Sequence, residues 1–301
     1  MVFGPINSRR FGISLGVDLS PLSKSCNFDC IYCELTAQKP TNIIPNPPSV
    51  KQIVNEVTNA LKIHSNTEVI TLTANGEPTL YPNLKELVSE LNLIKRDKKL
   101  LILSNGTGVL KDEVCDALMD IDIVKFSLDS AVQKTFKKID RGSKEILVDE
   151  LVTKMAEFRC KFKGELVLEV LVVAGLNDTL DEFRALNLAI NRIAPHRVDI
   201  SSIDRPPAYP VKGVSSKVLH ELSAQISGIP VVVVTTKNIN EQMDFSKDEI
   251  LQMLLRRPQS EANVADNFSQ ISKQNLAELL ADDKIYKTQV AGVSFYRVKN
   301  L

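Results

Sequence analysis

The sequence has little of several features that mark common classes of protein. It carries no net charge, because 37 basic residues balance 37 acidic ones, so no bulk electrostatic attraction to nucleic acid or membrane is indicated. No apolar stretch is long enough to span a bilayer. The N-terminus contains Arg9 and Arg10 and no apolar core, which argues against a signal peptide. We therefore expect a cytoplasmic protein without membrane partners.

Histidine and cysteine are also scarce. The three histidines lie far apart in the sequence, and no Ser-His-Asp or Cys-His arrangement of a hydrolase is visible. Five cysteines in 301 residues do not indicate a disulfide scaffold and favour a reducing compartment. The composition is otherwise that of an ordinary globular protein, 44% hydrophobic and 25% charged. The length suits one large domain, alone or with a small one.

Three of the cysteines, Cys26, Cys30 and Cys33, cluster in the stretch Cys-Asn-Phe-Asp-Cys-Ile-Tyr-Cys. Three thiolates on one loop can hold three corners of a metal cluster, whereas a structural zinc ion and an ordinary cubane each want four ligands. A cubane held by three thiolates leaves one iron open to a substrate or cofactor. The alternatives are three buried thiols, or zinc with a distant fourth ligand. Cys115 and Cys160 fall in or near expected helices and are interpreted as inert.

The spacing Cys-x3-Cys-x2-Cys, with the aromatic Tyr32 before the third cysteine, resembles the cluster loop of the radical SAM superfamily. The resemblance implies a [4Fe-4S] cluster on these cysteines, with its fourth iron chelated by S-adenosylmethionine. It also implies reductive cleavage of that cofactor to a 5'-deoxyadenosyl radical that abstracts hydrogen from a substrate. Such an oxidoreductase or transferase needs a reductant such as flavodoxin or ferredoxin. The alternative is a non-catalytic Fe-S or zinc sensor acting through its C-terminal domain.

A second motif, Asn75-Gly76-Glu77-Pro78, follows an expected strand. It resembles the Gly-Gly-Glu-Pro turn of the same superfamily, which implies contact with the amino group of S-adenosylmethionine. Asn75 stands where the family has glycine, and asparagine tolerates left-handed backbone better than most residues. Gly76 lets the backbone approach a ligand closely.

Further polar residues follow the ends of three other expected strands. The resemblance implies that Ser104 or Asn105 meets the methionine carboxylate, that Ser127 touches the ribose, and that the segment of Leu176 lies against adenine. For Ser104 and Asn105 the alternative is a plain strand-to-helix turn, although the carboxyl ends of barrel strands are where ligand contacts lie. Asp129 either contacts substrate or caps a loop.

Five charged residues are candidates for contacts in or beside a barrel. Glu169 interrupts an apolar strand, where a carboxylate is costly unless it faces a polar lumen or a solvated face. Arg9 and Arg10 either meet a phosphorylated substrate or bind solvent or a carboxylate on the rim. Asp204 and Arg205 either contact substrate or pair with each other.

Apolar runs alternate with amphipathic helices at least six times, which predicts a parallel sheet with right-handed crossovers. The expected fold class is α/β, with a partial (β/α)6 TIM-like barrel over residues 1–240, as the family resemblance also implies. Capping patterns predict helices that begin after Ser49, Asn83, Thr179 and Ser246. The expected strands are 13–19, 69–73, 100–103, 123–128, 166–173, 198–203 and 231–235.

Residues 241–301 do not continue the alternation of strands and helices. Their pattern predicts short helices followed by a hairpin over 285–298 and resembles a small winged-helix domain. Lys284, Lys287 and Arg297 on the hairpin would be the residues to touch phosphates. The third helix is not basic, which favours protein contact or capping of the barrel over nucleic acid. The opening segment and the Asn-Gly-Glu-Pro turn resemble Fe-S oxidoreductases related to the wyosine-synthesis branch. RNA and a small metabolite both stay open as substrates.

Overall fold

The computed structural model describes residues 1–8, 10–234, 242–256, 258–290 and 293–299. Its main feature is an eight-stranded sheet whose strands lie side by side in chain order. The first two strands pair antiparallel, and every later neighbour pairs parallel. The strands are β1 Val2–Ser8, β2 Gly12–Asp18, β3 Val69–Thr73, β4 Lys99–Ser104, β5 Ile123–Ser127, β6 Glu165–Val172, β7 Arg197–Ser202 and β8 Val231–Val233.

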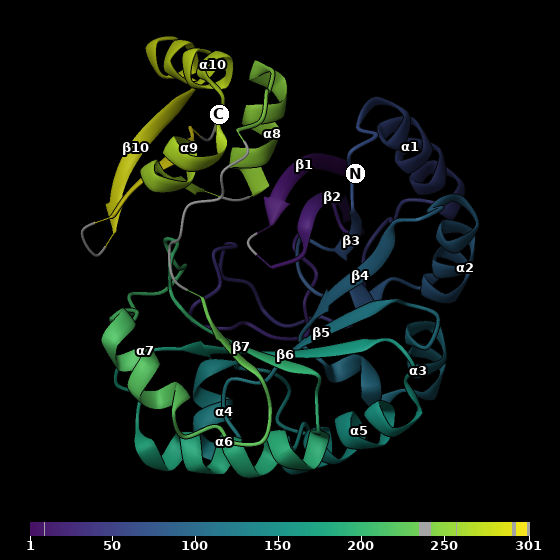
Figure 1. Ribbon diagram of the computed structural model, residues 1–301, viewed down its shortest axis with the longest axis vertical. Helices are drawn as coiled ribbons and strands as arrows, with labels where there is room; N and C mark the ends of the chain where they lie inside the picture. The colour runs from purple at the N-terminus through teal and green to yellow at the C-terminus, as the bar shows by residue number, and fades with distance from the viewer. Residues whose placement is uncertain (9, 235–241, 257, 291–292, 300–301) are drawn as a thin grey trace.

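Helices connect the parallel strands and cover the outer face of the curved sheet (Figure 1). They are α1 Val50–Ile63, α2 Leu84–Ile94, α3 Asp112–Leu118, α4 Gln133–Ile139, α5 Val148–Lys161, α6 Leu180–Ile193 and α7 Ser216–Ser223. This is the α/β architecture of a partial TIM-like barrel, as predicted. Within the described residues, no helix combines the length and apolar character that crossing a membrane requires.

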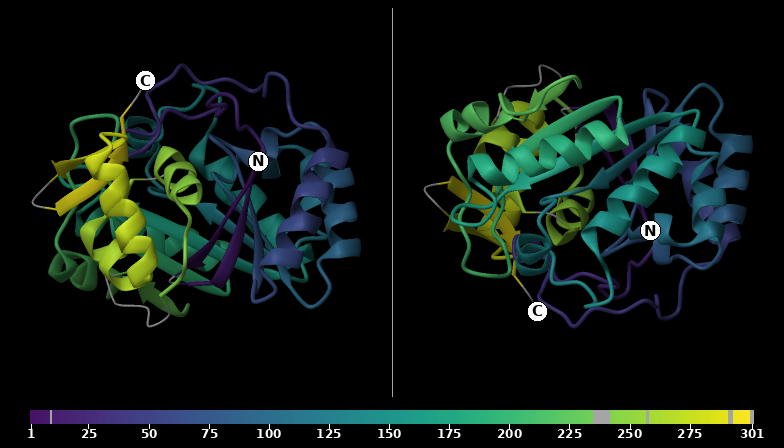
Figure 2. Two further views of the ribbon diagram at one scale, coloured as in Figure 1. Left: turned by 90° about the horizontal axis from the view of Figure 1, so that it is seen from above. Right: turned by 90° about the horizontal axis from the view of Figure 1, so that it is seen from below.

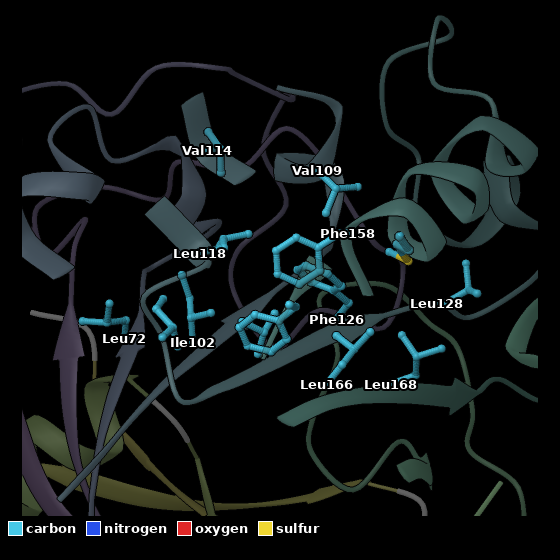
Figure 3. Packing of buried hydrophobic residues seen from close by; sticks show 14 of the residues in the cluster. Leu72, Ile102, Val109, Val114, Leu118, Phe126, Leu128, Phe158, Leu166 and Leu168 are labelled. Carbon is cyan, nitrogen blue, oxygen red and sulfur yellow. The ribbon is translucent and has the colours of Figure 1, made fainter. Parts of the chain in front are cut away.

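The largest core fills the space between the sheet and these helices (Figure 3). Phe126 of β5 packs on Phe158 of α5 with ring centroids 5.6 Å apart, and Leu166 and Leu168 of β6 lie beside them. Strands buried on both faces need nearly continuous apolar sequence, which is why these runs were recognisable. The core fixes the strand ends, and the candidate site residues lie at those ends.

Two capping predictions had different outcomes. At α1 the Ser49 hydroxyl accepts from the Gln52 amide and the Gln52 side chain accepts from the Ser49 amide, so the predicted capping box is confirmed. At α2 the helix begins after Asn83, as predicted, but Asn83 makes no side-chain capping bond. Its backbone has φ −106° and ψ 36°, outside the extended conformation of a usual N-cap.

Strand β1 was not predicted. Its sequence contains Gly4 and Pro5, which usually argue against a strand. It lies at the edge of the sheet, where a proline without an N–H is tolerated, and its register with β2 shifts between Phe3 and Ile6. Phe3 of this strand and Arg10, which follows just beyond its end, both line the barrel interior.

The C-terminal unit, residues 242–299 as far as they are described, has its own core around Phe245, Phe268 and Leu276. It contains α8 Lys247–Arg256, β9 Gln259–Ser260, α9 Glu261–Asn267, α10 Gln270–Ala281, β10 Ile285–Val290 and β11 Val293–Val298. The strands form a three-stranded sheet in the order β10-β11-β9. These elements have the helices and hairpin expected of a winged helix, an assignment that stays a prediction. The predicted domain boundary at 240–241 lies outside the described residues.

The C-terminal unit stands in the gap between β1 and the part of the barrel that carries α7 (Figure 1). Helix α8 contacts β1, and the Arg297 guanidinium donates to the Pro206 carbonyl at 3.4 Å. Seen from above and below, the unit lies at the opposite end of the molecule from α1 and α2 (Figure 2). It therefore closes the open side of the partial barrel.

Candidate functional site

The start of the cysteine loop is hydrogen-bonded to the Asn-Gly-Glu-Pro turn. Ser25 donates its amide to the Asn75 carbonyl at 2.8 Å, and the Glu77 amide donates back to the Ser25 carbonyl at 2.8 Å. Gly76, between them, has φ 137°, and a Cβ at this position would lie 1.9 Å from the Ser25 carbonyl oxygen. Only glycine fits such a close approach without moving the loop. The motif is thus joined directly to the first cysteine.

Glu77 is buried, and its carboxylate accepts four hydrogen bonds. The donors are the Thr79 amide at 3.0 Å, the Thr79 hydroxyl at 2.7 Å, the Ser104 hydroxyl at 2.8 Å and the Asn105 amide at 2.7 Å. Burial raises the pKa of Glu77, and these hydrogen bonds oppose that rise. Pro78 begins the short 3-10 turn behind it. Glu77 and Ser104 therefore hold two strand ends together, in addition to any contact they make with a ligand.

Asn105 faces the cysteine loop. Its side-chain amide donates to Asn27 Oδ1 at 2.7 Å and lies 3.9 Å from Cys26 Sγ. Asn27 in turn donates to the Thr107 hydroxyl at 2.7 Å. This chain of amides fixes the loop between its first two cysteines to the turn that follows β4.

The other flank of the loop rests on the segment after α4. The Asp29 amide donates to the Asp140 carbonyl at 3.1 Å, and the Ile31 amide to the Ile139 carbonyl at 2.9 Å. The Cys30 thiol lies 3.4 Å from Asp140 Oδ1. No motif in the sequence marked Asp140 as a neighbour of the cysteine loop.

Tyr32 is tied to Asp129 at the end of β5. Its hydroxyl donates to Asp129 Oδ2 at 2.5 Å, while Asp129 Oδ1 accepts from the Leu171 amide at 2.7 Å. Burial raises the pKa of Asp129 to about 6. Asp129 thus serves at least as the loop anchor that was one of its two predicted roles.

The three loop thiols are close enough to affect one another. Burial, followed by the charge of Glu77, raises the pKa of Cys26 to about 12. Burial also raises the pKa of Cys30 and Cys33, and the nearby cysteines raise that of Cys30 further. Three half-buried thiolates so close together would repel one another unless a cation neutralised them, and the irons of a bound cluster would supply that positive charge. The donor set therefore fits the group.

Among the described residues, no three His, Cys, Asp or Glu side chains converge on one point as a single-ion site requires. An iron–sulfur cubane does not need such convergence, since each thiolate binds a different iron. Cys115 is half-buried with its thiol 3.4 Å from the Val109 carbonyl, and Cys160 is exposed on α5. Neither belongs to the loop.

Ser127 and Leu176 approach the same region from β5 and from the turn after β6. Ser127 is half-buried at the end of β5, and its hydroxyl makes no hydrogen bond with the described residues. Leu176 packs in a small apolar cluster that includes Ile31 and Tyr32 of the cysteine loop. The structure thus brings the residues predicted for the cluster and for S-adenosylmethionine to one end of the sheet, around the loop.

A cavity of about 700 Å³ occupies the barrel interior beside this loop. Glu34, directly after the third cysteine, lines it together with Asn75. From the barrel wall come Lys125 and Glu169, which form an ion pair. Of the two alternatives for Glu169, the structure shows the one in which its carboxylate faces the lumen. Burial would raise the pKa of Glu169, but Lys125 and Arg10 outweigh it and hold that pKa well below its usual range.

The arginines of the cavity are held by carboxylates. Arg10 pairs with Glu169 and lies 3.3 Å from Asp199 Oδ2, which supports the carboxylate contact among the alternatives predicted for it. Arg205 pairs with Glu34 at 3.1 Å and lies 3.9 Å from Asp204. Its main carboxylate partner is therefore Glu34, and the pair with Asp204, one of the two alternatives, is the longer contact. Arg9 lies outside the described residues.

The C-terminal unit completes the cavity wall. Met253 and Leu255 of α8 line it, as does Gln259 of β9. These residues lie more than two hundred positions from Phe3, which lines the same space. No local pattern in the sequence indicated this contact.

Comparison with known proteins agrees with the geometry. The family model described as the Radical SAM superfamily matches residues 20–191, more than half of the chain. A UPF0026 protein of Helicobacter pylori is 37% identical over 98% of this chain and 97% of its own. An S-adenosylmethionine-dependent nucleotide dehydratase of Flammeovirga pacifica is 24% identical over 76% of this chain and 72% of its own.

Among solved structures, a radical SAM methyltransferase from Sphaerobacter thermophilus matches 73% of this chain and 65% of its own with a TM-score of 0.59. At 14% identity this match shows a shared fold only.

Proposed function

Because the chain belongs to the radical SAM superfamily, whose enzymes use a [4Fe-4S] cluster and S-adenosylmethionine, we propose that Cys26, Cys30 and Cys33 hold the cluster. The observation that carries this proposal is the cysteine loop itself. Its three thiols are half-buried and close together, and its backbone is fixed at both flanks by Gly76 and Asp140. Three thiolates leave one iron for the cofactor.

When bound, the cluster would pass one electron from a reductant to S-adenosylmethionine, whose cleavage to methionine and a 5'-deoxyadenosyl radical would supply the group that removes a hydrogen atom from the substrate. The chain's own residues hold and shield them. Ser127 and Asn105 offer polar groups at the end of the sheet beside the loop, and Leu176 with Tyr32 offers an apolar surface. Asn75, Gly76, Glu77, Pro78 and Ser104 complete the proposed S-adenosylmethionine site, the buried Glu77 by fixing the backbone around it.

The substrate that fits best is a small polar molecule held in the barrel cavity. The volume of about 700 Å³ lies in the range of small-molecule sites. Among the described residues, three cations line the cavity, Arg10, Lys125 and Arg205, and each is paired with a carboxylate of the same cavity. An RNA or a polyphosphate would need cations that are free to meet phosphates. The balanced lining therefore favours a neutral or zwitterionic metabolite.

Production of 5'-deoxyadenosine tests the activity. The protein is reconstituted anaerobically with iron and sulfide, reduced with dithionite and given S-adenosylmethionine, and the nucleoside is measured by chromatography. We expect C26A, C30A and C33A each to fall to background, because each removes one ligand of the cluster. The variants C115A and C160A are matched controls outside the loop and should keep the wild-type rate.

The opposite result would be a wild-type protein that forms no 5'-deoxyadenosine under these conditions. One zinc per chain without sulfide, together with that result, would support the non-catalytic sensor instead.

A further inference from the structure

The surface that covers the cysteine loop is strongly basic. The segment 133–144, which contains α4, carries five cations against one acidic residue, while the whole chain is neutral. That acidic residue, Asp140, is buried against Cys30, so it does not offset the charge at the surface. The exposed cations of this segment are Lys134, Lys137, Lys138, Arg141 and Lys144, which we call the α4 basic surface.

Helical geometry places the charges on the outer side of α4. Phe136 and Ile139 are buried and face inward, while Lys134, Lys137 and Lys138 are spaced three and four residues apart on the exposed side. None of the four lysines forms an ion pair with a described residue. Exposed lysines without ion-pair partners among the described residues are available to an acidic partner. The acidic residues that follow the segment are Glu145, Asp149 and Glu150.

The inner side of the same helix touches the cysteine loop. The Phe136 ring meets the Phe28 ring edge-on with centroids 5.7 Å apart, and a Cβ on Gly142 would lie 2.4 Å from the Phe28 ring. With the backbone bonds from Asp29 and Ile31, these contacts leave one layer of protein between the loop and the basic surface. A molecule seated on α4 would be close to the cluster without entering the cavity.

We propose that the α4 basic surface is the docking site of an acidic electron-transfer protein that reduces the cluster. The inference rests on the proposed function. One electron leaves the reduced donor, which is oxidised by one electron, and the cluster is reduced by one. Opposite charges on the two surfaces would steer the encounter and orient the donor against α4. Three unpaired lysines on a short helix and a fourth at Lys144 beyond it form a small surface for RNA, whose binding usually depends on more phosphate contacts.

Binding is tested with oxidised flavodoxin, an acidic protein, as the probe. The dissociation constant is measured calorimetrically with the full-length reconstituted protein. We expect K137E/K138E to weaken binding by about tenfold or more, and added salt to weaken wild-type binding strongly. The variant K137R/K138R keeps the charges and should bind as the wild type does. K51E/K62E makes the same charge change on α1, on the far side of the barrel, and should also bind normally (Figure 1).

Two rates of 5'-deoxyadenosine formation separate docking from chemistry. With reduced flavodoxin as the donor, we expect K137E/K138E to be slowed by about tenfold, in proportion to its loss of binding. With dithionite, a small reductant that needs no docking surface, the same variant should match the wild type. If dithionite gives no product even with the wild type, the proposed function fails, while the binding comparison still tests the surface.

Three results would overturn the proposal. The first is unchanged flavodoxin binding by K137E/K138E, and the second is an equal loss of rate with both reductants. The third is a charge reversal that abolishes binding of a single-stranded RNA probe but leaves flavodoxin binding intact, which would assign the surface to nucleic acid.

Discussion

At the scale of single residues, the site depends on positions where the backbone approaches another segment closely. The Gly76 backbone packs against that of Ser25 at the start of the cysteine loop, and the Asp140 carbonyl accepts a hydrogen bond from the Asp29 amide on the other flank of the loop. The cysteines, Tyr32 and the Asn-Gly-Glu-Pro turn could be predicted because their spacing is local. Asp140 could not, because its contact with Cys30 spans 110 positions and follows from the packing of α4.

Replacing Gly76 with alanine tests this close approach. A Cβ 1.9 Å from the Ser25 carbonyl oxygen would push the loop away from the turn, so G76A should bind clearly less iron than the wild type after reconstitution. G175A is the matched control, since Gly175 also has a positive φ of 76° but no atom lies within 4 Å of the new Cβ. It should lose about 1 kcal/mol of stability at most and keep its iron. Equal iron content in both variants would contradict the argument.

At the scale of elements, charged side chains join neighbouring strands inside the barrel. Lys125 comes from β5, Glu169 from β6 and Asp199 from β7, and Arg10 reaches them from the β1–β2 connection. Glu169 and Asp199 are register partners on adjacent strands, so their carboxylates would repel each other without Arg10 between them. The network places charge in the lumen and holds the strand order at the same time.

The variant E169Q should destabilise the protein by about 2–3 kcal/mol at pH 7, because it leaves Lys125 and Arg10 partly buried without their shared carboxylate. The folded-state pKa of Glu169 lies below its unfolded value of about 4.3, so its contribution is fully present above that pH. It is lost progressively as pH falls further. The difference between E169Q and the wild type should therefore shrink near pH 3.

Urea unfolding at both pH values measures this difference. E157Q, which removes a carboxylate from the exposed pair with Lys154, is the control and should change stability little at either pH. A difference for E169Q that is the same at pH 7 and pH 3 would show that Glu169 does not act through its charge.

Most elements of the barrel were predictable, because each parallel strand is a buried apolar run followed by an amphipathic helix. The expected strand 69–73 matches β3, and the expected strand 198–203 is shifted by one residue from β7. Strand β1 was missed because its stability comes from pairing with β2 at the sheet edge and not from its own composition. Helix α2 begins after Asn83 as predicted, but the capping bond is absent, because residue type alone does not fix the backbone angles that such a bond needs.

At the scale of the whole molecule, the barrel is open on one side and the C-terminal unit fills that opening (Figure 1). The unit contributes Met253 and Leu255 to the cavity and meets β1 through α8. Contacts between segments so far apart in the sequence depend on the completed fold, so sequence analysis could name capping of the barrel only as one alternative. This arrangement favours a substrate that is enclosed between the two parts.

The most direct test of the account is electron paramagnetic resonance of the reconstituted, dithionite-reduced protein before and after addition of S-adenosylmethionine. The account predicts a reduced cubane signal, with about four irons and four sulfides per chain. That signal should change when the cofactor occupies the open iron. A cubane signal that does not respond to S-adenosylmethionine, or a chain that binds zinc without sulfide, would contradict it.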